Sequence, residues 1–321
     1  MFKFLLGLTL LVGPSYAAVN RTRFQAAAVN DPSTTARLTE NTVGSAALRA
    51  QIMLDRSGFS VGEIDGRIGK NTLRAVAGLQ ALHGLTSSNV IDGPTWEILN
   101  ATGEPALVPY SVTEDDLKGP FTKVPADMMA KAKLESLGYE NLLEELGEKF
   151  HCNPTLLRLL NPRARFDKVG EDLIVPNIRT PLEAVASRVV VSKSASTVTV
   201  FDASGKLIAQ YPCTSGSEHD PLPIGAWKVT GVFKNPKFFY DPNLFWDASP
   251  DTAKARIAPG PNNPVGLVWI GISKEHYGIH GSPEPSSIGH TESHGCIRLT
   301  NWDAVELAGM VKRNVPVSLE E

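Results

Sequence analysis

The spacing of apolar residues changes once along the chain, near Arg188, and this change limits what the chain can fold into. In the N-terminal half, apolar residues such as Leu73 and Val76 recur at intervals of three and four, which is typical of amphipathic helices. After Arg188, apolar residues such as Val189 and Val191 alternate with polar ones, which is typical of strands. We therefore expect a multi-domain chain with helical N-terminal units and a mainly β domain, a sandwich or barrel, at its C-terminal end.

The size and charge of the chain exclude several classes of protein. A length of 321 residues is enough for more than one domain, and 42% hydrophobic with 20% charged residues is ordinary for a soluble protein. The 31 basic residues nearly balance the 34 acidic ones, so the net charge of −3 provides no field that would hold nucleic acid or an anionic membrane. We expect a monomer with no nucleic-acid partner.

Residues 1–17 have the features of a signal peptide. Lys3 supplies a positive charge, residues 4–12 form a short apolar segment, and residues 15–17 place small side chains where signal peptidase cleaves. The apolar segment is much shorter than the roughly 20 residues of a spanning helix, and no cysteine follows it to carry a lipid. We expect an exported protein without a membrane span, either periplasmic or associated with the cell wall.

A polar, flexible leader over residues 18–43 is expected to precede a first domain over residues 44–101. Helical spacing predicts three short helices there, with a turn at Asp65 and Gly66. The strings "LDRSGFSVGEIDGRIGKNTLRAVAGLQALHGL" and "IDGPTWEIL" resemble the type 1 peptidoglycan-binding domain, which implies binding to the cell wall. Two alternatives stay open: a helical spacer that binds nothing, and a calcium loop, for which the turn lacks the oxygen ligands of an EF-hand.

A proline-rich linker over residues 102–133 is expected to lead into a small α+β module over residues 134–178. Leucine spacing predicts two helices, and a short strand is expected at residues 172–176. The strings "LLEELGEKFHCNPTLLRLLNP" and "VGEDLIVP" resemble a LysM glycan-binding module, although the opening strand of such a module is not visible. A plain connecting subdomain is the alternative.

The β-rich part is expected to span residues 184–319, and it contains a long segment without clean periodicity. Between Lys234 and Pro264 the sequence has six prolines and many aromatic residues. Such a segment is too long for a simple connection, so we expect a lid or a loop that faces the substrate.

Two histidines and a cysteine, His280, His294 and Cys296, lie close together in this part. A thiol attacks a carbonyl only as the thiolate, so we expect an imidazole, that of His280, to lower the pKa of Cys296. Gly295 has no Cβ, so the backbone can turn sharply and point the amides of His294, Gly295 and Cys296 at one oxyanion. The pattern predicts nucleophilic catalysis by a cysteine.

Arg298 is expected to face the same site as the thiol, because it lies two residues after Cys296 on a short strand. Its guanidinium would suit a carboxylate on the substrate, and a structural salt bridge is the alternative. A helix over residues 301–313, capped by Thr300, is expected to brace the site, with five apolar residues pointing inward: Ala304, Val305, Leu307, Ala308 and Val311.

The histidine spacing raises one alternative. His276 and His280, like His290 and His294, are four residues apart, which on a helix would place two imidazoles on one face, as in zinc sites. Glycines and prolines interrupt both windows, and no HExxH glutamate is present. We expect no metal and no cofactor, and His294 is left with two possible roles, contact with substrate or packing.

The strings "IHGS" at residues 279–282 and "SHGCIRL" at residues 293–299 resemble the signature of the YkuD-type L,D-transpeptidases, supported upstream by "PCTSG", "PLPIGAW" and "NPVGLVWI". The resemblance implies that Cys296 is the nucleophile and His280 the base. It also implies an orienting backbone carbonyl, either that of Gly281 or that of Ser282. The remaining positions of the signature are Ser293, His294, Gly295 and Arg298.

The same resemblance implies the reaction. The thiol would attack the bond between diaminopimelate and D-Ala in a tetrapeptide stem of peptidoglycan, D-Ala would leave, and an amine of a neighbouring stem would take the acyl group to give a 3–3 cross-link. Water as acceptor would make the protein an L,D-carboxypeptidase, and a lipoprotein lysine would make it an anchoring transferase. A carbapenem would acylate Cys296. A non-catalytic scaffold that binds stem peptides and glycan is the alternative from another class.

The other two cysteines leave one question open. A disulfide between Cys152 and Cys213 would leave Cys296 as the only free thiol, but the two residues belong to different expected modules. A buried, free Cys213 is the alternative.

Overall fold

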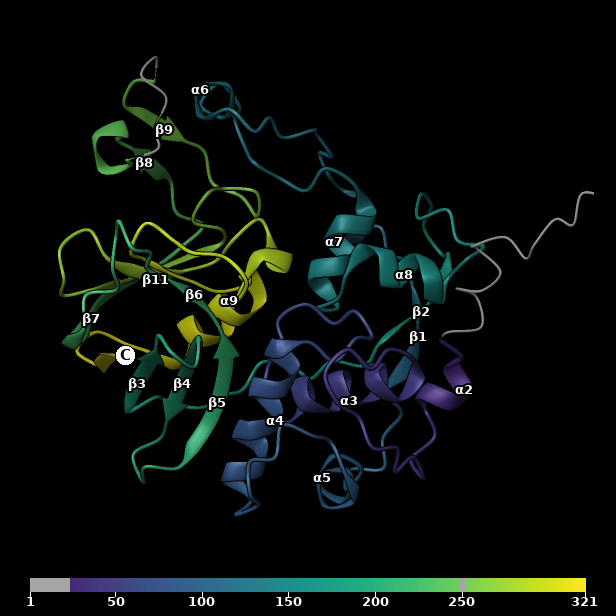
Figure 1. Cartoon of the computed structure of the whole chain (residues 1–321). Helices are drawn as coiled ribbons and strands as arrows, with labels where there is room; N and C mark the ends of the chain where they lie inside the picture. Colours follow the sequence, from purple (N-terminus) through teal and green to yellow (C-terminus); the bar gives the residue numbers. More distant parts are fainter. Residues whose placement is uncertain (1–23, 247, 249–251) are drawn as a thin grey trace, which may run out of the picture.

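A computed structural model of the chain describes residues 24–246, 248 and 252–321. Three units follow one another: a helical first domain, a second module with two strands and two helices, and a β domain. Figure 1 shows the first domain and the second module together on one side of the β domain. In the described residues, no helix is long and apolar enough to cross a bilayer. The expected signal peptide lies outside the described residues.

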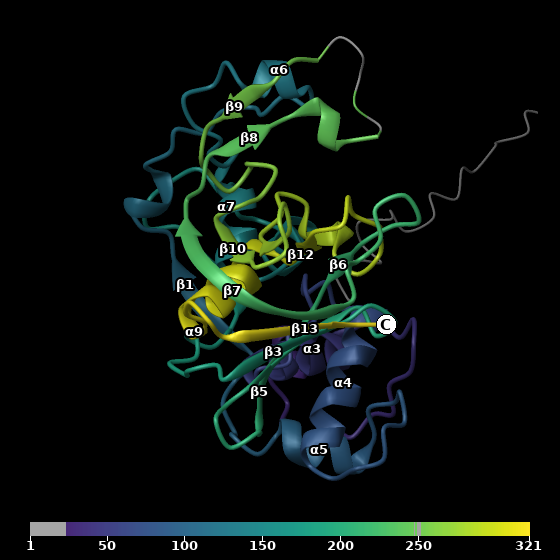
Figure 2. The ribbon, with the colours of Figure 1, turned by 90° about the vertical axis from the view of Figure 1, so that its left-hand side faces the viewer.

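The β domain is built on a nine-stranded sheet with the strand order β5-β4-β3-β13-β7-β10-β11-β12-β6. Figure 2 shows how β7 runs as a long, curved strand through it. In chain order the strands are β3 (Arg188–Ser192), β4 (Thr197–Phe201), β5 (Leu207–Pro212), β6 (Thr214–Ser215), β7 (Gly225–Lys234), β10 (Val268–Ile272), β11 (Gly278–His280), β12 (Ile297–Arg298) and β13 (Pro316–Glu320). The alternating residues Val189, Val191, Val198 and Val200 are all buried in one core, which confirms the predicted mainly β fold.

One helix, α9 (Asn301–Met310), packs on this sheet next to the strands β10 and β11. Thr300 caps it by accepting a hydrogen bond from the amide of Asp303, as expected. The helix is shorter than the predicted 301–313 because Val311 is extended, with φ −98° and ψ 151°, and leads toward β13. Four of the five residues expected to face inward are buried. The prediction is wrong for Val305, whose side chain is 39% exposed.

The first domain contains α3 (Ser45–Arg56), α4 (Lys70–Leu82) and α5 (Gly93–Leu99), as predicted. The leader differs from the expectation, because residues 24–43 are packed on this domain and contain the short helix α2 (Ala26–Val29). Val29 and Leu38 are buried, and Leu38 pairs with Ile91 in an isolated bridge. These apolar residues fill gaps between helices one at a time, so they show no helical or strand period in the sequence.

The second module consists of β1 (Leu107–Ser111), α7 (Leu142–Lys149), α8 (Pro154–Leu160) and β2 (Asp172–Pro176), with β1 antiparallel to β2. The expected linker is therefore structured: residues 102–133 contain β1, a 3-10 turn (η1, Asp115–Leu117) and the short helix α6 (Met128–Lys131). Proline-rich composition concealed β1, which tolerates Pro109 because it is paired on one side only. Glycan binding by this module stays a prediction.

The first domain is joined closely to both neighbours. It shares one continuous hydrophobic core with the second module, and Ile64 forms a bridge with Cys152. On the other side, residues next to Phe59 lie along the edge strand β5: the amide of Ser60 donates to the carbonyl of Gln210 at 2.9 Å, and the amide of Gln210 donates to the carbonyl of Gly58 at 2.9 Å. The first domain thus extends the sheet at its edge.

The two cysteines of uncertain pairing are both buried and free. Cys152 lies in the second module and Cys213 just after β5, so the disulfide that the odd count allowed is not formed. Burial raises the pKa of the Cys213 thiol to about 12 and that of Cys152 well above its usual range, so both behave as small apolar side chains.

The long aromatic segment before β10 is a hairpin rather than an irregular loop. Its strands are β8 (Phe238–Tyr240) and β9 (Ala255–Ile257), which pair antiparallel, with a 3-10 turn (η2, Pro242–Leu244) after β8. A further 3-10 turn (η3, Pro285–Ser287) follows β11. Residues 247 and 249–251, between β8 and β9, lie outside the description.

Candidate active site

Two neighbouring strands bring the predicted site residues together. Strand β11 ends at His280 and pairs in parallel with β12, so that His280 lies opposite Arg298 and Ile279 opposite Ile297. Both isoleucines are buried in the core. Because side chains alternate along a strand, Cys296, Arg298 and His280 occupy the other face, with the thiol one step of the register from the imidazole.

His280 is buried and held on two sides. Its ring stacks on Trp269, with centroids 5.4 Å apart and planes 17° apart, and its Nδ1 lies 2.7 Å from the carbonyl oxygen of Gly281. Of the two carbonyls that the sequence left open, the one that His280 contacts is thus that of Gly281. Burial lowers the pKa of His280 to about 4, and the charge of Arg298 acts in the same direction, against the hydrogen bond to Gly281.

The pKa of Cys296 is raised, whereas the sequence predicted that His280 would lower it. Burial raises its pKa; the amide of Gly278 and the charge of Arg298 favour the thiolate but do not outweigh burial. The sulfur lies 3.7 Å from the carbonyl oxygen of His276, to which a thiol can donate. The resting pair is therefore a neutral thiol beside a neutral imidazole.

The loop before Cys296 is fixed by Ser293. Its hydroxyl donates to the carbonyl oxygen of Cys296 at 2.6 Å and accepts from the amide of Gly216 at 2.7 Å, which links this loop to the end of β6. Gly295 has φ +89°, and a Cβ there would lie 2.6 Å from the ring of Tyr277. The sharp turn that was expected before the thiol therefore requires glycine at this position.

Asn301 is a site residue that the sequence did not reveal. It is fully buried at the start of α9, and its Oδ1 would overlap a Cβ placed on Gly281. The same oxygen accepts from the amide of Leu267 at 3.1 Å, and Nδ2 donates to Glu148 of the second module at 2.7 Å. Asn301 thus fixes the backbone whose carbonyl orients His280.

His294 lies under the β8–β9 hairpin. Its ring contacts Phe245 edge to face, with centroids 5.0 Å apart, and Trp246 at 6.0 Å. Trp246 also stacks on His219 at 4.5 Å. Of the two roles left open for His294, the described contacts include packing; contact with a substrate stays a prediction.

Arg298 and Asp220 supply opposite charges near the thiol. The charge of Arg298 favours the thiolate of Cys296, and that of Asp220 disfavours it. Arg298 lies opposite His280 in the register, and its charge acts on the thiol; its suitability for a carboxylate stays a prediction. Within the described residues, no group of three or more His, Cys, Asp and Glu side chains is placed to hold a metal ion.

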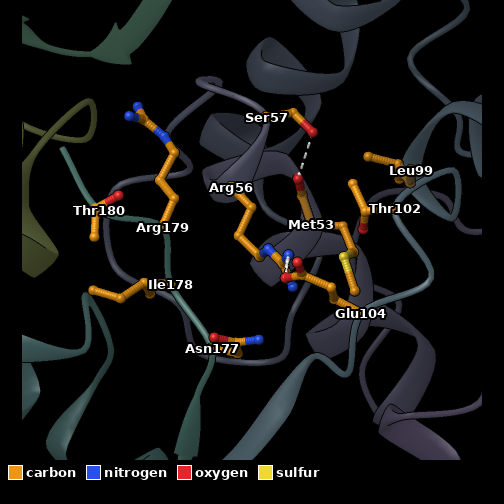
Figure 3. A pocket seen from close by; sticks show the side chains of 10 residues that line it. All are labelled: Met53, Arg56, Ser57, Leu99, Thr102, Glu104, Asn177, Ile178, Arg179 and Thr180. Carbon is orange, nitrogen blue, oxygen red and sulfur yellow. Dashed lines mark hydrogen bonds and ion pairs between the residues drawn. The ribbon is translucent and has the colours of Figure 1, made fainter. Parts of the chain in front are cut away.

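A pocket of about 320 Å³ lies elsewhere, between the first domain and the segment after β2 (Figure 3). None of the predicted site residues lines it. Arg56 crosses the pocket and pairs with Glu104, and the hydroxyl of Ser57 donates to the carbonyl of Met53. The pocket is therefore a feature of the joint between the first domain and the second module, separate from the thiol.

Two stretches of the chain match known families. A profile of the L,D-transpeptidase catalytic domain (YkuD) matches residues 186–319, and a profile of a peptidoglycan binding domain matches residues 43–99. A Bacillus licheniformis protein named L,D-transpeptidase YkuD is 30% identical over 179 residues, which cover 55% of this chain and 92% of that protein. A Bacillus subtilis protein of the same name is 26% identical over 178 residues, with the same two shares of 55% and 92%. A solved L,D-transpeptidase from Mycobacterium smegmatis is 20% identical with a TM-score of 0.34, over 50% of this chain and 77% of that one.

Proposed function

The chain belongs to the YkuD family of L,D-transpeptidases, and we propose that its Cys296 takes an acyl group from a peptidoglycan stem peptide and passes it to an amine. The observation that supports the proposal is the register of β11 and β12, in which His280 lies opposite Arg298 and Cys296 directly precedes β12. The family makes the protein an acyltransferase of the cell wall, and the residue roles that follow are proposed from the site.

The first half of the reaction forms a thioester. Nε2 of His280 takes the proton of the thiol as sulfur attacks the carbonyl between diaminopimelate and D-Ala. The amides of His294, Gly295 and Cys296 stabilise the oxyanion. When the tetrahedral intermediate collapses, the C–N bond breaks, His280 returns the proton to the nitrogen of D-Ala, and D-Ala leaves.

The second half transfers the acyl group. The amine of a neighbouring stem attacks the thioester and gives its proton to His280. The C–S bond then breaks, and sulfur recovers the proton as a thiol. With a diaminopimelate amine as acceptor, the product is a 3–3 cross-link.

The neutral resting pair fits this sequence of steps. A buried thiolate and imidazolium would need to be desolvated together, whereas a neutral pair separates charge only when the substrate carbonyl arrives. The Gly281 carbonyl keeps the proton on Nδ1 of His280, since a carbonyl accepts and cannot donate. Nε2 is then the basic nitrogen.

Arg298 and the first domain supply binding. The guanidinium pairs with a carboxylate of the stem peptide. The first domain, whose residues 43–99 match a peptidoglycan binding domain, holds the protein on its polymeric substrate and raises the local concentration of stems at the thiol. We propose a periplasmic or wall-associated location, reached through the signal peptide.

Mass spectrometry of muropeptides tests the function. The full-length protein is incubated with tetrapeptide-stem muropeptides, and release of D-Ala together with 3–3 linked dimers is expected. Cys296→Ala should abolish both while binding to isolated sacculi persists, and persistent turnover in this variant would contradict the mechanism. Loss of D-Ala without dimers would make the protein a carboxypeptidase, and a stem-modified lysine on an added lipoprotein would make it an anchoring transferase.

A further inference from the structure

An arm of the second module reaches over the β domain. The chain between β1 and α7 leaves the module, and its residues 121–138, here called the arm, run to the β8–β9 hairpin, here called the lid hairpin. Figures 1 and 2 both show α6, which belongs to the arm, beside β9. Contact of α6 with β9 brings the two segments together although more than a hundred residues separate them.

The arm and the lid hairpin share a small hydrophobic core of their own. Leu137 of the arm is fully buried with Tyr240 of β8 and Ile257 of β9. Partly buried residues of both segments pack around them: Val124, Met128, Met129, Ala132, Leu134, Phe238, Phe245, Ala255 and Ala258. This core is separate from the two larger ones.

Hydrogen bonds fix the arm to the chain that follows the lid hairpin. The amide of Leu137 donates to the carbonyl of Pro259 at 2.9 Å, and the carbonyl of Leu137 accepts from the amide of Asn262 at 3.0 Å. Gly260 lies between these two, and a Cβ there would overlap the backbone of Leu137. This close backbone contact, together with the apolar core, sets where the lid hairpin can lie.

The lid hairpin in turn touches the loop that carries the thiol. Phe245, at the end of η2, packs against Tyr240 with centroids 5.5 Å apart and against His294 at 5.0 Å. His294 precedes Cys296 by two residues. A continuous row of contacts therefore runs from Leu137 through Tyr240 and Phe245 to His294.

We propose that the arm is a positioning element that holds the lid hairpin over the acyl-enzyme and so favours an amine over water as the acyl acceptor. The inference rests on the proposed function. Both acceptors break the same C–S bond and return one proton to sulfur: the amine forms a C–N bond, and water forms a C–O bond. Because the two reactions are so similar, the product depends on whether the lid hairpin keeps water away from the thioester.

A matched pair of leucine variants tests the inference. Leu137→Ala removes the buried leucine through which the arm packs on the hairpin, and Leu173→Ala removes a buried leucine from β2 that has no part in the arm core. In full-length protein, Leu137→Ala is expected to raise the ratio of hydrolysed tetrapeptide to 3–3 dimer at least threefold, and Leu173→Ala is expected to leave it unchanged. An unchanged ratio in Leu137→Ala, or an equal rise in both variants, would overturn the inference.

A second readout separates this inference from the proposed function. After a carbapenem has acylated the protein, intact-mass measurement gives the lifetime of the adduct, which is expected to shorten at least threefold in Leu137→Ala. Met128→Ser, a milder change in the arm, serves if Leu137→Ala does not fold, with the same expectation. A wild-type protein that neither releases D-Ala nor forms dimers would contradict the proposed function, whereas an active wild type with unchanged adduct lifetime in both arm variants would contradict only the role of the arm.

Discussion

Nδ1 of His280 lies 2.7 Å from the carbonyl oxygen of Gly281, so the proton of the neutral imidazole is fixed on the side away from the reacting atoms. This contact depends on the backbone of Gly281, which has little freedom to move. Gly281 packs directly against Asn301, and Asn301 is held in turn by the amide of Leu267 and by Glu148.

The first prediction concerns the acid limb of the pH–rate profile, the range in which the rate falls as pH falls. Burial and the charge of Arg298 lower the pKa of His280 to about 4, so the base form exists above that pH and is lost as pH falls through it. The rate of carbapenem acylation should be nearly level between about pH 5 and 7 and fall about tenfold per unit well below pH 4. Arg298→Met should move the limb to higher pH, because it removes the charge that opposes protonation. An acid limb near 6.5 in the wild type would contradict the assignment.

The second prediction concerns the contact between Gly281 and Asn301. Gly281→Ala adds a Cβ that overlaps Oδ1 of Asn301, so the backbone must shift and the carbonyl must leave His280. We expect acylation of Cys296 to slow at least tenfold, measured by intact mass over time. Gly69→Ala is the control, since nothing lies within 4 Å of a Cβ at that position. Equal rates in the two variants would show that the Gly281 carbonyl does not position the base.

The third prediction compares two helical glycines. Alanine is favoured over glycine in a helix by about 1 kcal/mol. In α9, a Cβ on Gly309 meets nothing within 4 Å, so Gly309→Ala should raise the free energy of unfolding by about 0.5–1 kcal/mol. In α4, a Cβ on Gly78 would overlap the side-chain amide of Gln210, whose Nε2 donates to the carbonyl of Arg74 at 2.9 Å. Gly78→Ala should instead lower the free energy of unfolding, because the lost hydrogen bond leaves buried polar groups unpaired at a cost of about 1–3 kcal/mol, which outweighs the helical gain.

Urea unfolding measures both values. Adding Gln210→Ala to Gly78→Ala should remove the overlap, so that Gly78→Ala in this background no longer destabilises. If Gly78→Ala stabilises the protein as Gly309→Ala does, the first domain is not packed against β5 as described.

The fourth prediction concerns the pH dependence of stability, which arises from titratable groups where the first domain, the second module and the β domain meet. Burial raises the pKa of Asp303 in α9 to about 7, and its Oδ2 accepts from the hydroxyl of Ser60 at 2.9 Å. Nδ1 of His151 lies 3.2 Å from Asp55. Burial lowers the pKa of His151, but the charge of Asp55 and the hydrogen bond to it outweigh burial and raise it.

Both shifts make the folded protein less stable as pH rises. The stabilisation that Asp303 gives the folded protein is fully present below its unfolded pKa of 3.8 and is lost as pH rises through about 7. The stabilisation from His151 is fully present below its unfolded pKa of 6.5 and is lost as pH rises through its raised pKa. The melting temperature should fall by several degrees between about pH 5 and 8. Asp303→Asn, which cannot ionise, should flatten this slope, and an unchanged slope would remove Asp303 as its source.

The sequence predicted the elements whose pattern is local. Strands β3 and β4 alternate because one face of the sheet is buried, and the residues that carry this pattern, such as Val189 and Val200, lie in the core. Strand β1 was missed because its partner β2 follows only after three helices, α6, α7 and α8, and Pro109 made the segment resemble a linker. The packed residues 24–43 were missed because single apolar side chains fill separate gaps.

At the site, residue types were predictable and their environment was not. Cys296, His280 and Arg298 stand out by chemistry and spacing, but the raised pKa of Cys296 comes from burial, which depends on segments distant in the chain. Asn301 gave no signal beyond its place after the capping residue Thr300, and its contact with Glu148 joins two modules. The length and aromatic content of residues 234–264 predicted a lid or a loop that faces the substrate, and that role stays a prediction; the contact of the hairpin with the arm gave no signal in the sequence.

The pairing of Gly58 and Ser60 with Gln210 has a consequence for how this protein can be handled. An edge strand offers unpaired amides and carbonyls to any other extended chain. Cutting away the first domain would expose such a row on β5, so a truncated β domain would tend to associate with itself. The first domain therefore also serves as a protective cover for this edge, and its removal should lower the solubility of the β domain.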